Sequence, residues 1–176
     1  MRIIGGKYRG RTLVPFKGRD IRPTSDRVKE SLFNILAPEI SGANVLDLFC
    51  GTGSVGLEAI SRGADLVVFN DVSADSLGVL RKNLELLHAQ AKVYNLDFRA
   101  LLPRLDVTFD IVFIDPPYKS GFAAEALELV AAHSLVNTGG VAVVESDRPF
   151  EAAPASLVRY DERRYGGTYL TFYSPE

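Results

Sequence analysis

The stretch "VLDLFCGTGSVGLEAI", residues 45 to 60, decides the fold of this chain. Its first residues are apolar and strand-forming, and its last residues favour a helix. Between them lies a G-x-G-x-x-G loop built on Gly51, Gly53 and Gly56. Such a loop makes a tight turn between a strand and a helix and lets a ligand approach the main chain. The stretch therefore predicts an α/β sheet with an adenosine-containing ligand at this loop.

Strand-like and helix-like segments alternate along most of the chain. The predicted strands are residues 44–49, 66–71, 92–97, 109–115 and 141–146. The predicted helices between them are residues 54–62, 74–88 and 122–133. Because these connections are too long for hairpins, the sheet should be mainly parallel with helices on both faces. The segment "LVRYDERRYGGTYLTFY" (157–173) predicts two further strands joined through Arg164 to Gly167, which gives the sheet an antiparallel end.

The N-terminal residues precede this alternation. Residues 1–4 and 8–14 predict a short β-hairpin around a Gly5-Gly6 turn. The segment "RPTSDRVKESLFNIL" (22–36) predicts a helix that Thr24 or Ser25 caps and that Pro38 ends. Its expected apolar stripe consists of Val28, Leu32, Ile35 and Leu36. We expect residues 1–20 to be an extension and residues 21–176 to form the main domain.

The composition is that of a water-soluble globular domain. The hydrophobic fraction is 47% and the charged fraction 24%, and no apolar stretch approaches the ~20 residues that span a bilayer. The N-terminus is too polar for a secretory signal, so a cytoplasmic location is expected. One cysteine and two histidines argue against a disulfide framework and a zinc site. We expect a monomer without metal or membrane contact.

The basic residues are concentrated at the N-terminus. Residues 1–29 contain nine bases and two acids, whereas the remaining residues contain 11 bases and 20 acids. Glycine and aromatic residues are interleaved with these bases. A basic arm on an acidic body favours a polyanionic partner, because neutralised phosphates release counterions. A solvated surface face is the alternative. The predicted nucleic-acid-binding residues, for which the resemblance given below implies RNA, are Arg2, Lys7, Arg9, Arg11 and Arg22.

Two acids lie near the glycine loop, and only the second, Asp47, separates a nicotinamide cofactor from S-adenosylmethionine. Asp71 lies 20 residues after Gly51, at the end of the next strand, where an acid accepts hydrogen bonds from ribose hydroxyls. Asp47 lies four residues before Gly51 and should face the ligand. A carboxylate there would repel a dinucleotide pyrophosphate but attract the ammonium of a methionine moiety. The pattern D-x-x-x-G-T-G therefore favours S-adenosylmethionine (AdoMet) over a nicotinamide cofactor.

The third predicted strand also ends in an acid. Asp97 could accept a hydrogen bond from the adenine amino group, with Phe98 beside the ring, or it could simply cap a following helix. The residues leave both possibilities open. Cys50 lacks the proline of a Pro-Cys nucleophile motif and should only pack against the turn.

The fourth predicted strand ends in Asp115-Pro116-Pro117-Tyr118. Taken alone, this is ordinary turn chemistry. At the same sheet edge as the glycine loop, however, Asp115 and the main-chain carbonyl of Pro116 could both accept hydrogen bonds from an exocyclic amine and orient it towards a methyl donor. The prolines restrict the backbone and hold that carbonyl outward. Tyr118 could stack on a flipped or single-stranded base. We therefore predict that these four residues are catalytic.

With these motifs in this order, the chain resembles the bacterial 16S rRNA guanine-N2 methyltransferases of the RsmD family. The segments that carry the resemblance are "MRIIGGKYRGRTL", "RPTSDRVKESLFNIL", "DLFCGTGSVGLEAISRGA" and "DPPY". The first two are the specific ones, because many amino-methyltransferases share the others. The resemblance implies a Rossmann-like class I AdoMet methyltransferase fold, with a seven-stranded, mostly parallel sheet whose last strand is antiparallel and an N-terminal β-hairpin.

The resemblance also implies a substrate and a set of binding residues. The substrate would be 16S rRNA of the small ribosomal subunit. The expected cofactor-binding residues are Asp47, Phe49, Gly51, Gly53, Asp71, Asp97, Phe98 and Thr24. Arg22 and Pro23 would line the same pocket together with Thr24. The chain departs from the family at Asp71, where many relatives have glutamate, and its C-terminal segment matches only loosely. A DNA adenine-N6 methyltransferase and an RNA-binding assembly factor with a vestigial cofactor site are the alternatives.

Overall fold

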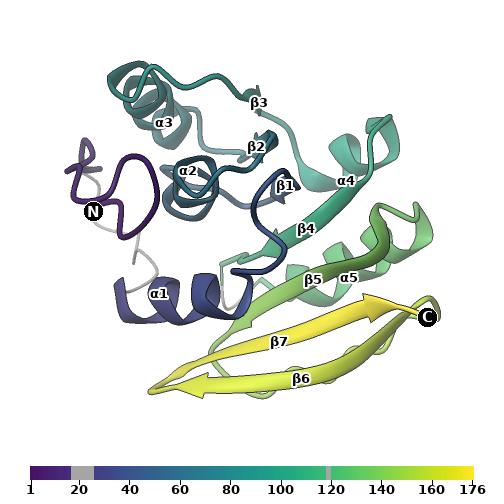
Figure 1. Cartoon of the computed structure of the whole chain (residues 1–176). Coiled ribbons are helices and arrows are strands. Elements are labelled where there is room, and N and C mark those ends of the chain that lie inside the picture. Colours follow the sequence, from purple (N-terminus) through teal and green to yellow (C-terminus); the bar gives the residue numbers. More distant parts are fainter. Residues whose placement is uncertain (17–25, 118–119) are drawn as a thin grey trace.

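The computed structural model describes residues 1–16, 26–117 and 120–176 (Figure 1). Its helices are α1 (Asp26–Ile35), α2 (Ser54–Ser61), α3 (Ala74–Leu86), α4 (Phe98–Leu101), the 3-10 turn η1 (Leu102–Arg104) and α5 (Phe122–Ala132). Its strands are β1 (Asn44–Asp47), β2 (Leu66–Asn70), β3 (Lys92–Tyr94), β4 (Phe109–Ile114), β5 (Val136–Ser146), β6 (Leu157–Tyr165) and β7 (Thr168–Pro175). Within these described residues, no helix combines the length and the apolar character that a bilayer crossing requires.

The seven strands form one sheet in the order β3-β2-β1-β4-β5-β7-β6. The neighbours from β3 to β5 pair in parallel, and β7 pairs antiparallel with both β5 and β6. The expected class I methyltransferase sheet with an antiparallel last strand is therefore confirmed. β3 ends at Tyr94, three residues earlier than predicted. Asp97 caps α4, a short helix that was not among the predicted elements, so the second of the two possibilities for Asp97 is the one that the structure shows.

Two apolar cores cover the two faces of the sheet. α1, α2 and α3 pack on one face together with the N-terminal residues, and we call this the α1 face. α4, η1 and α5 pack on the other, the α5 face. In Figure 1 these two groups of helices flank the sheet, and the β6–β7 hairpin extends from its edge. The alternation of residues along each strand therefore decides which side chains reach which face.

Helix α1 buries a different stripe from the one predicted. Val28, Leu32, Phe33 and Leu36 are buried, whereas Ile35 is only half-buried. The stripe is shifted because Phe33, the largest apolar side chain of the segment, points into the core and takes the place assigned to Ile35. The predicted caps, Thr24 and Ser25, lie outside the described residues.

The prediction of a hairpin with a Gly5-Gly6 turn is wrong in detail. The only ladder contact of the described N-terminal residues is the bridge between Arg2 and Thr12, and the chain reverses over a wider loop. Gly6 has a φ of +75°, and a Cβ there would lie 1.9 Å from the carbonyl oxygen of Ser61 at the end of α2. This glycine therefore allows the N-terminal loop to approach α2 closely and does not form a hairpin turn.

A buried polar cluster fixes the N-terminal loop to α1 and α2. The Glu58 carboxylate accepts hydrogen bonds from the main-chain N–H groups of Ile4 and Gly5 at 2.8 and 2.7 Å. The Lys29 ammonium lies 3.7 Å from the same carboxylate, and neither side chain is exposed to solvent. Lys29 also donates a hydrogen bond to the Arg2 carbonyl at 2.8 Å. This cluster joins three segments that are distant in sequence.

Candidate active site

Three acids lie on the α1 face at the carboxyl edge of three neighbouring strands. Asp47 ends β1, Asp115 follows β4, and Glu145 is the next-to-last residue of β5. Their preceding neighbours, Leu46, Ile114 and Val144, all pack in the core of the α5 face. Because side chains alternate along a strand, the three acids lie on the opposite face. The sheet thus brings together Asp47 and Asp115, as predicted, and adds Glu145.

Asp47 is 2% exposed, and its carboxylate accepts a hydrogen bond from the Gly56 N–H at 2.9 Å. Gly56 lies in the first turn of α2, where the helix dipole favours a negative charge. Burial nevertheless dominates and raises the pKa of Asp47 to about 7, because desolvation disfavours the ionised carboxylate. The Gly56 hydrogen bond partly offsets this rise, and the nearby charge of Asp71 adds to it.

The glycines of the loop differ in their surroundings. Gly51 has a φ of +53°, and a Cβ there would meet no atom within 4 Å. Gly53 and Gly56 are packed: a Cβ would lie 2.4 Å from Leu80 at Gly53 and 2.2 Å from Phe69 at Gly56. Gly51 thus borders open space where a ligand could approach, whereas Gly53 and Gly56 allow α2 to pack closely against the sheet.

Asp71 orders the same loop. One carboxylate oxygen accepts a hydrogen bond from the Gly51 N–H and the other from the Ser73 N–H, each at 2.8 Å. Asp71 remains partly exposed. Since each carboxylate oxygen can accept more than one hydrogen bond, these contacts leave capacity for ribose hydroxyls. Cys50, which directly precedes Gly51, is buried as expected, and burial raises the pKa of its thiol.

Asp97 is confirmed as a helix cap. Its carboxylate accepts a hydrogen bond from the Arg99 N–H at 2.9 Å and pairs with the Arg99 guanidinium at 3.1 Å. Arg99 also binds Glu125 of α5 and lies over the rings of Phe98 and Phe122. Phe98 is therefore buried beneath Arg99, and its contact with the adenine ring stays a prediction.

The half-buried Phe49 is an accessible aromatic side chain beside the glycine loop. Its ring centroid lies 5.2 Å from that of Phe98, in a tilted arrangement. It lies two residues after the end of β1 and two residues before Gly51. This position places an accessible aromatic ring beside the glycine loop, as expected for a residue that contacts adenosine.

The Asp115-Pro116-Pro117 segment leaves the sheet directly after β4. Asp115 is partly buried and Pro116 buried, whereas Pro117 is exposed. Burial raises the pKa of Asp115 well above its ordinary value, and the charges of Glu145 and Asp47 raise it further. The Pro117 carbonyl accepts hydrogen bonds from the N–H and hydroxyl of Ser120, which close a turn. Tyr118 lies outside the described residues.

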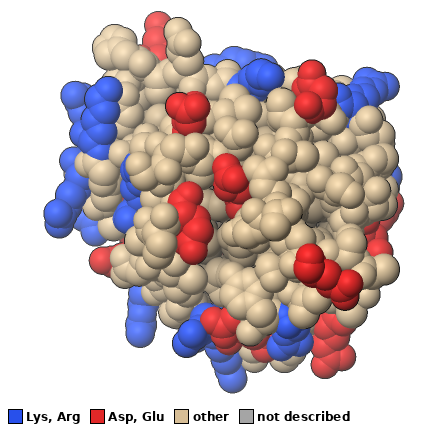
Figure 2. Space-filling view, turned by 45° about the vertical axis from the view of Figure 1, so that its right-hand side comes forward, with Lys and Arg blue, Asp and Glu red and all other residues tan. Residues whose placement is uncertain are grey.

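The predicted RNA-binding residues do not lie at one place. Lys7 and Arg9 are exposed near the C-terminal end of α2, where the Lys7 N–H binds the Ser61 carbonyl. Arg2 pairs with Asp26 at 3.0 Å, at the start of α1. Arg11 is exposed, and Arg22 lies outside the described residues. Figure 2 shows basic side chains gathered at the left of the view, the side on which the N-terminal loop lies in Figure 1.

The β6–β7 turn adds basic side chains near the acids. β7 begins where β5 ends, since Ser146 pairs with Tyr169 and Glu145 with Leu170. Arg163 and Arg164 on β6 are exposed, and the Arg164 guanidinium lies over the Tyr169 ring at 5.4 Å. The hairpin therefore returns to the carboxyl edge of the sheet, beside Asp115 and Glu145.

Sequence reasoning missed Glu145 and the buried pair of Lys29 and Glu58. The signal for Glu145 was available, because it closes the apolar run "VAVV" as Asp115 closes "DIVFI". Lys29 and Glu58 are flanked by apolar residues in their helices. A charged residue in such a position is expected to be buried only if a residue of opposite charge is known to lie close to it. That proximity depends on how α1 packs against α2.

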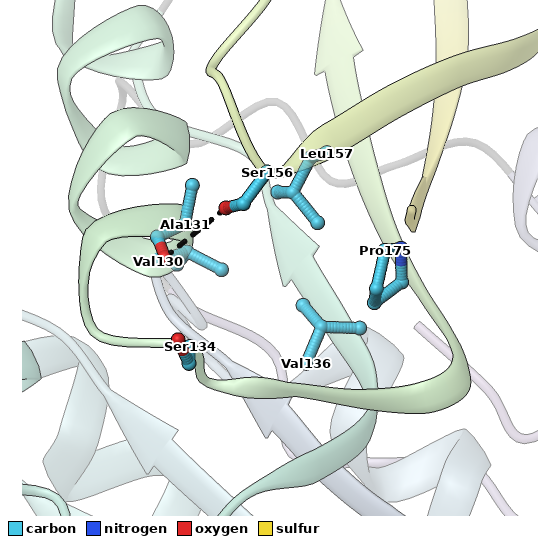
Figure 3. A pocket seen from close by; sticks show the side chains of 7 residues that line it. All are labelled: Val130, Ala131, Ser134, Val136, Ser156, Leu157 and Pro175. Atoms are coloured by element: carbon cyan, nitrogen blue, oxygen red, sulfur yellow. Dashed lines mark hydrogen bonds between the residues drawn. The ribbon is translucent and has the colours of Figure 1, made fainter.

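A small apolar cavity lies away from these residues (Figure 3). Its volume is about 80 Å³, and it lies between α5 and the strands β5, β6 and β7. Val136 begins β5, Leu157 begins β6 and Pro175 ends β7, so the cavity is at the amino edge of the parallel strands. The acids lie at the opposite edge, and the cavity is not part of the candidate site.

The residues at the carboxyl edge fit AdoMet. The open space at Gly51 admits a ligand, Asp47 offers a carboxylate beside a helix N-terminus, and Phe49 offers an accessible ring. Asp71 retains acceptor capacity for hydroxyls. These residues therefore offer hydrogen-bond acceptors for an ammonium and for hydroxyl groups at the strand ends where the sequence predicted them.

Comparison with known proteins agrees with this reading. The family model "Conserved hypothetical protein 95" matches residues 1–174. Ribosomal RNA small subunit methyltransferase D of Haemophilus influenzae is 40% identical over 84% of this chain and 79% of its own length. The Escherichia coli protein of the same name is 36% identical over 100% of this chain and 90% of its own.

Solved structures of similar proteins have the same fold as this chain. The Escherichia coli protein yhhF superimposes with a TM-score of 0.91 at 36% identity, over 100% of this chain and 98% of its own. A Thermus thermophilus 16S rRNA N2 G1207 methyltransferase, in complex with AdoMet and guanosine, has a TM-score of 0.71 at 27% identity. This match covers 92% of this chain and 45% of the Thermus thermophilus chain. The chain therefore belongs to the ribosomal RNA small subunit methyltransferase D (RsmD) family of class I methyltransferases.

Proposed function

We propose that this protein transfers the methyl group of AdoMet to the exocyclic N2 amine of a guanine in 16S rRNA. The observation that carries the proposal is the position of Asp115. This residue follows β4, and β4 pairs in the sheet with β1, which ends in Asp47 and leads into the glycine loop. The names of the relatives support ribosomal RNA as the substrate class. The guanosine bound by the Thermus thermophilus structure supports the choice of base.

The cofactor would supply a methyl group activated by its positive sulfonium. Asp47, Asp71 and Phe49 would bind its ammonium, ribose and adenine, respectively. An ammonium beside Asp47 would favour the ionised carboxylate, which burial alone disfavours. Binding of the cofactor would therefore remove an electrostatic cost that the free protein carries. Asp97 and Phe98 would contribute from the edge of the same pocket, and Thr24 is proposed from the resemblance alone.

Asp115 and the Pro116 carbonyl would hold the target amine. The lone pair of this amine is delocalised into the base, so two acceptors are needed to orient its N–H groups and expose the nitrogen. Their effect is mainly alignment, which is worth several orders of magnitude in rate when the reacting atoms are held in line. Asp115 could also receive the proton that the amine loses. Tyr118 would stack on the base.

The RNA would contact basic side chains on both sides of this site. Arg2, which pairs with Asp26 at the start of α1, and Arg163 and Arg164 on β6 are exposed. Arg163 is two strands from Glu145 on the same face of the sheet, and Arg164 follows it on the opposite face. Lys7, Arg9 and Arg11 would bind phosphates farther from the reacting base, and Arg22 is proposed with them from the sequence. We further propose a monomer located in the cytoplasm, with residues 1–20 as an RNA-binding extension of the domain formed by residues 21–176.

A transfer assay with tritiated AdoMet tests the substrate class. The acceptors are small ribosomal subunits from a strain lacking the homologous enzyme, naked 16S rRNA, large subunits and duplex DNA. We expect label in the small-subunit RNA only, and Asp115→Ala should abolish it while calorimetry shows AdoMet bound with unchanged affinity. Label in duplex DNA alone would favour adenine-N6 transfer. An absence of AdoMet binding would favour a non-catalytic assembly factor.

A further inference from the structure

Glu145 occupies a position equivalent to that of Asp115 on the next strand. Ile114 pairs with Val144 in the parallel ladder of β4 and β5, so the residues that follow them lie side by side. Neighbouring strands are about 4.8 Å apart. Both acids lie on the α1 face, and Glu145 pairs in the ladder with Leu170, which packs in the core of that face. The main-chain geometry thus places two carboxyl groups next to each other.

This arrangement is costly for a protein interior. Glu145 is 3% exposed, and burying a carboxylate beside a second carboxyl group is unfavourable when both are ionised, because their charges repel. Its charge is also among the causes that raise the pKa of the Asp115 carboxyl. The described residues contain no group of three or more His, Cys, Asp or Glu side chains that could hold a metal ion. A carboxylate can accept hydrogen bonds from several donors at once, so Glu145 can bind a ligand in addition to any partner within the protein.

The Watson–Crick edge of guanine provides two adjacent donors. Its 2-amino group and N1–H lie next to each other, whereas adenine has an acceptor at N1 beside its 6-amino group. An enzyme that reads a flipped base does so by hydrogen bonds to this edge. We propose that Glu145 accepts a hydrogen bond from guanine N1–H while Asp115 accepts from the 2-amino group, so that the acid pair selects guanine over adenine. This inference rests on the proposed function and deepens it.

2-Aminopurine is a suitable probe for this proposal. It keeps the 2-amino group but has an unprotonated N1, which a carboxylate would repel. The base is placed at the modified position of 16S rRNA by ligation of a synthetic fragment, and kcat/KM is measured for guanine and for 2-aminopurine. Wild type should prefer guanine by at least about 100-fold, because a site built to bind an N–H strongly rejects an analogue without it. Loss of the 6-oxo group contributes to the same ratio, so the variants below are required.

Glu145→Gln isolates the contact at N1. The glutamine amide can donate to an unprotonated N1, so the guanine to 2-aminopurine ratio should fall at least tenfold. Glu145→Asp keeps the charge and should keep a preference for guanine. A merely structural role of Glu145 would lower both rates together and leave the ratio unchanged.

The outcomes separate the two proposals. Equal use of both bases by wild type, or an unchanged ratio in a Glu145→Gln enzyme that binds AdoMet normally, would overturn the role of Glu145 alone. If Glu145→Gln does not fold, Glu145→Ala, which removes the carboxylate, takes its place: a guanine to 2-aminopurine ratio at least tenfold below that of wild type supports the role, and an unchanged ratio refutes it. No transfer to guanine by wild type would overturn the proposed function itself, and this inference with it.

Discussion

The Asp47 carboxylate accepts a hydrogen bond from the Gly56 N–H at 2.9 Å, across the loop that joins β1 to α2. The contact fixes the end of the strand to the first turn of the helix and so determines the shape of the glycine loop. It also holds an acid in a position where only 2% of its surface is exposed. The loop is therefore ordered by a group whose protonation state matters to both stability and ligand binding.

Asp47 should make the ligand-free protein less stable as the pH rises. Its pKa is about 7 in the folded chain against an ordinary value of 3.8, so the folded state binds the proton more tightly. The resulting stabilisation is complete below about pH 4 and is lost as the pH rises to 7. Relative to Asp47→Asn, whose amide still accepts from Gly56, the wild-type free energy of unfolding should fall by about 3 kcal/mol between pH 5 and pH 8. Urea denaturation across this range measures it, and parallel pH profiles for the two proteins would contradict it.

Gly56 should be intolerant of a side chain for steric reasons. A Cβ would lie 2.2 Å from Phe69, in a helix that packs directly on the sheet, so Gly56→Ala should destabilise by about 1–3 kcal/mol. Gly78 in α3 is the matched control, because a Cβ there meets no atom within 4 Å. Gly78→Ala should stabilise by about 0.5–1 kcal/mol. Thermal denaturation of both variants tests the comparison, and equal effects of the same sign would refute it.

The Lys29–Glu58 pair should contribute far more than a surface pair. Lys29→Met leaves the Glu58 carboxylate buried with one cation fewer, and breaking such a pair costs about 3–5 kcal/mol. The control is Arg2→Ala, which removes a solvent-exposed pair with Asp26 and should cost under about 1 kcal/mol. Both values come from urea denaturation. A cost for Lys29→Met no larger than that for Arg2→Ala would show that the cluster does not hold the N-terminal loop.

Asp115 should make methyl transfer depend on pH. Because burial and the charges of Glu145 and Asp47 raise its pKa, the neutral form of Asp115, which is a poorer acceptor, persists to higher pH than for an ordinary carboxyl group. The single-turnover rate should therefore still increase with pH above the range in which an ordinary carboxyl group ionises. Asp115→Asn should lower the rate at least about 100-fold, remove this dependence and leave AdoMet affinity unchanged. A wild-type rate that falls over the same range would be inconsistent with this role.

The features that could be predicted from the sequence are those that depend on a local pattern, such as an apolar strand that ends in an acid. The strand-ending acids Asp47, Asp71 and Asp115 could be placed because parallel strands end at one edge of a sheet, and the structure brings them there. Phe33 could not be assigned to the core, because that depends on how α1 rotates against the sheet. The role of Gly6 depends on the approach of the N-terminal loop to α2, which no spacing within the sequence encodes. Arg99 covers Phe98 through contacts that only the packing of α4 against α5 creates.

The central claim is that the chain methylates the N2 amine of a guanine. The most direct test is mass-spectrometric analysis of nucleosides from small-subunit RNA, prepared from a strain lacking the homologous enzyme and incubated with the protein and AdoMet. We expect N2-methylguanosine to appear with wild type and to be absent with Asp115→Ala. The appearance of N6-methyladenosine, or of no new methylated nucleoside in RNA that the native homologue does modify, would contradict it.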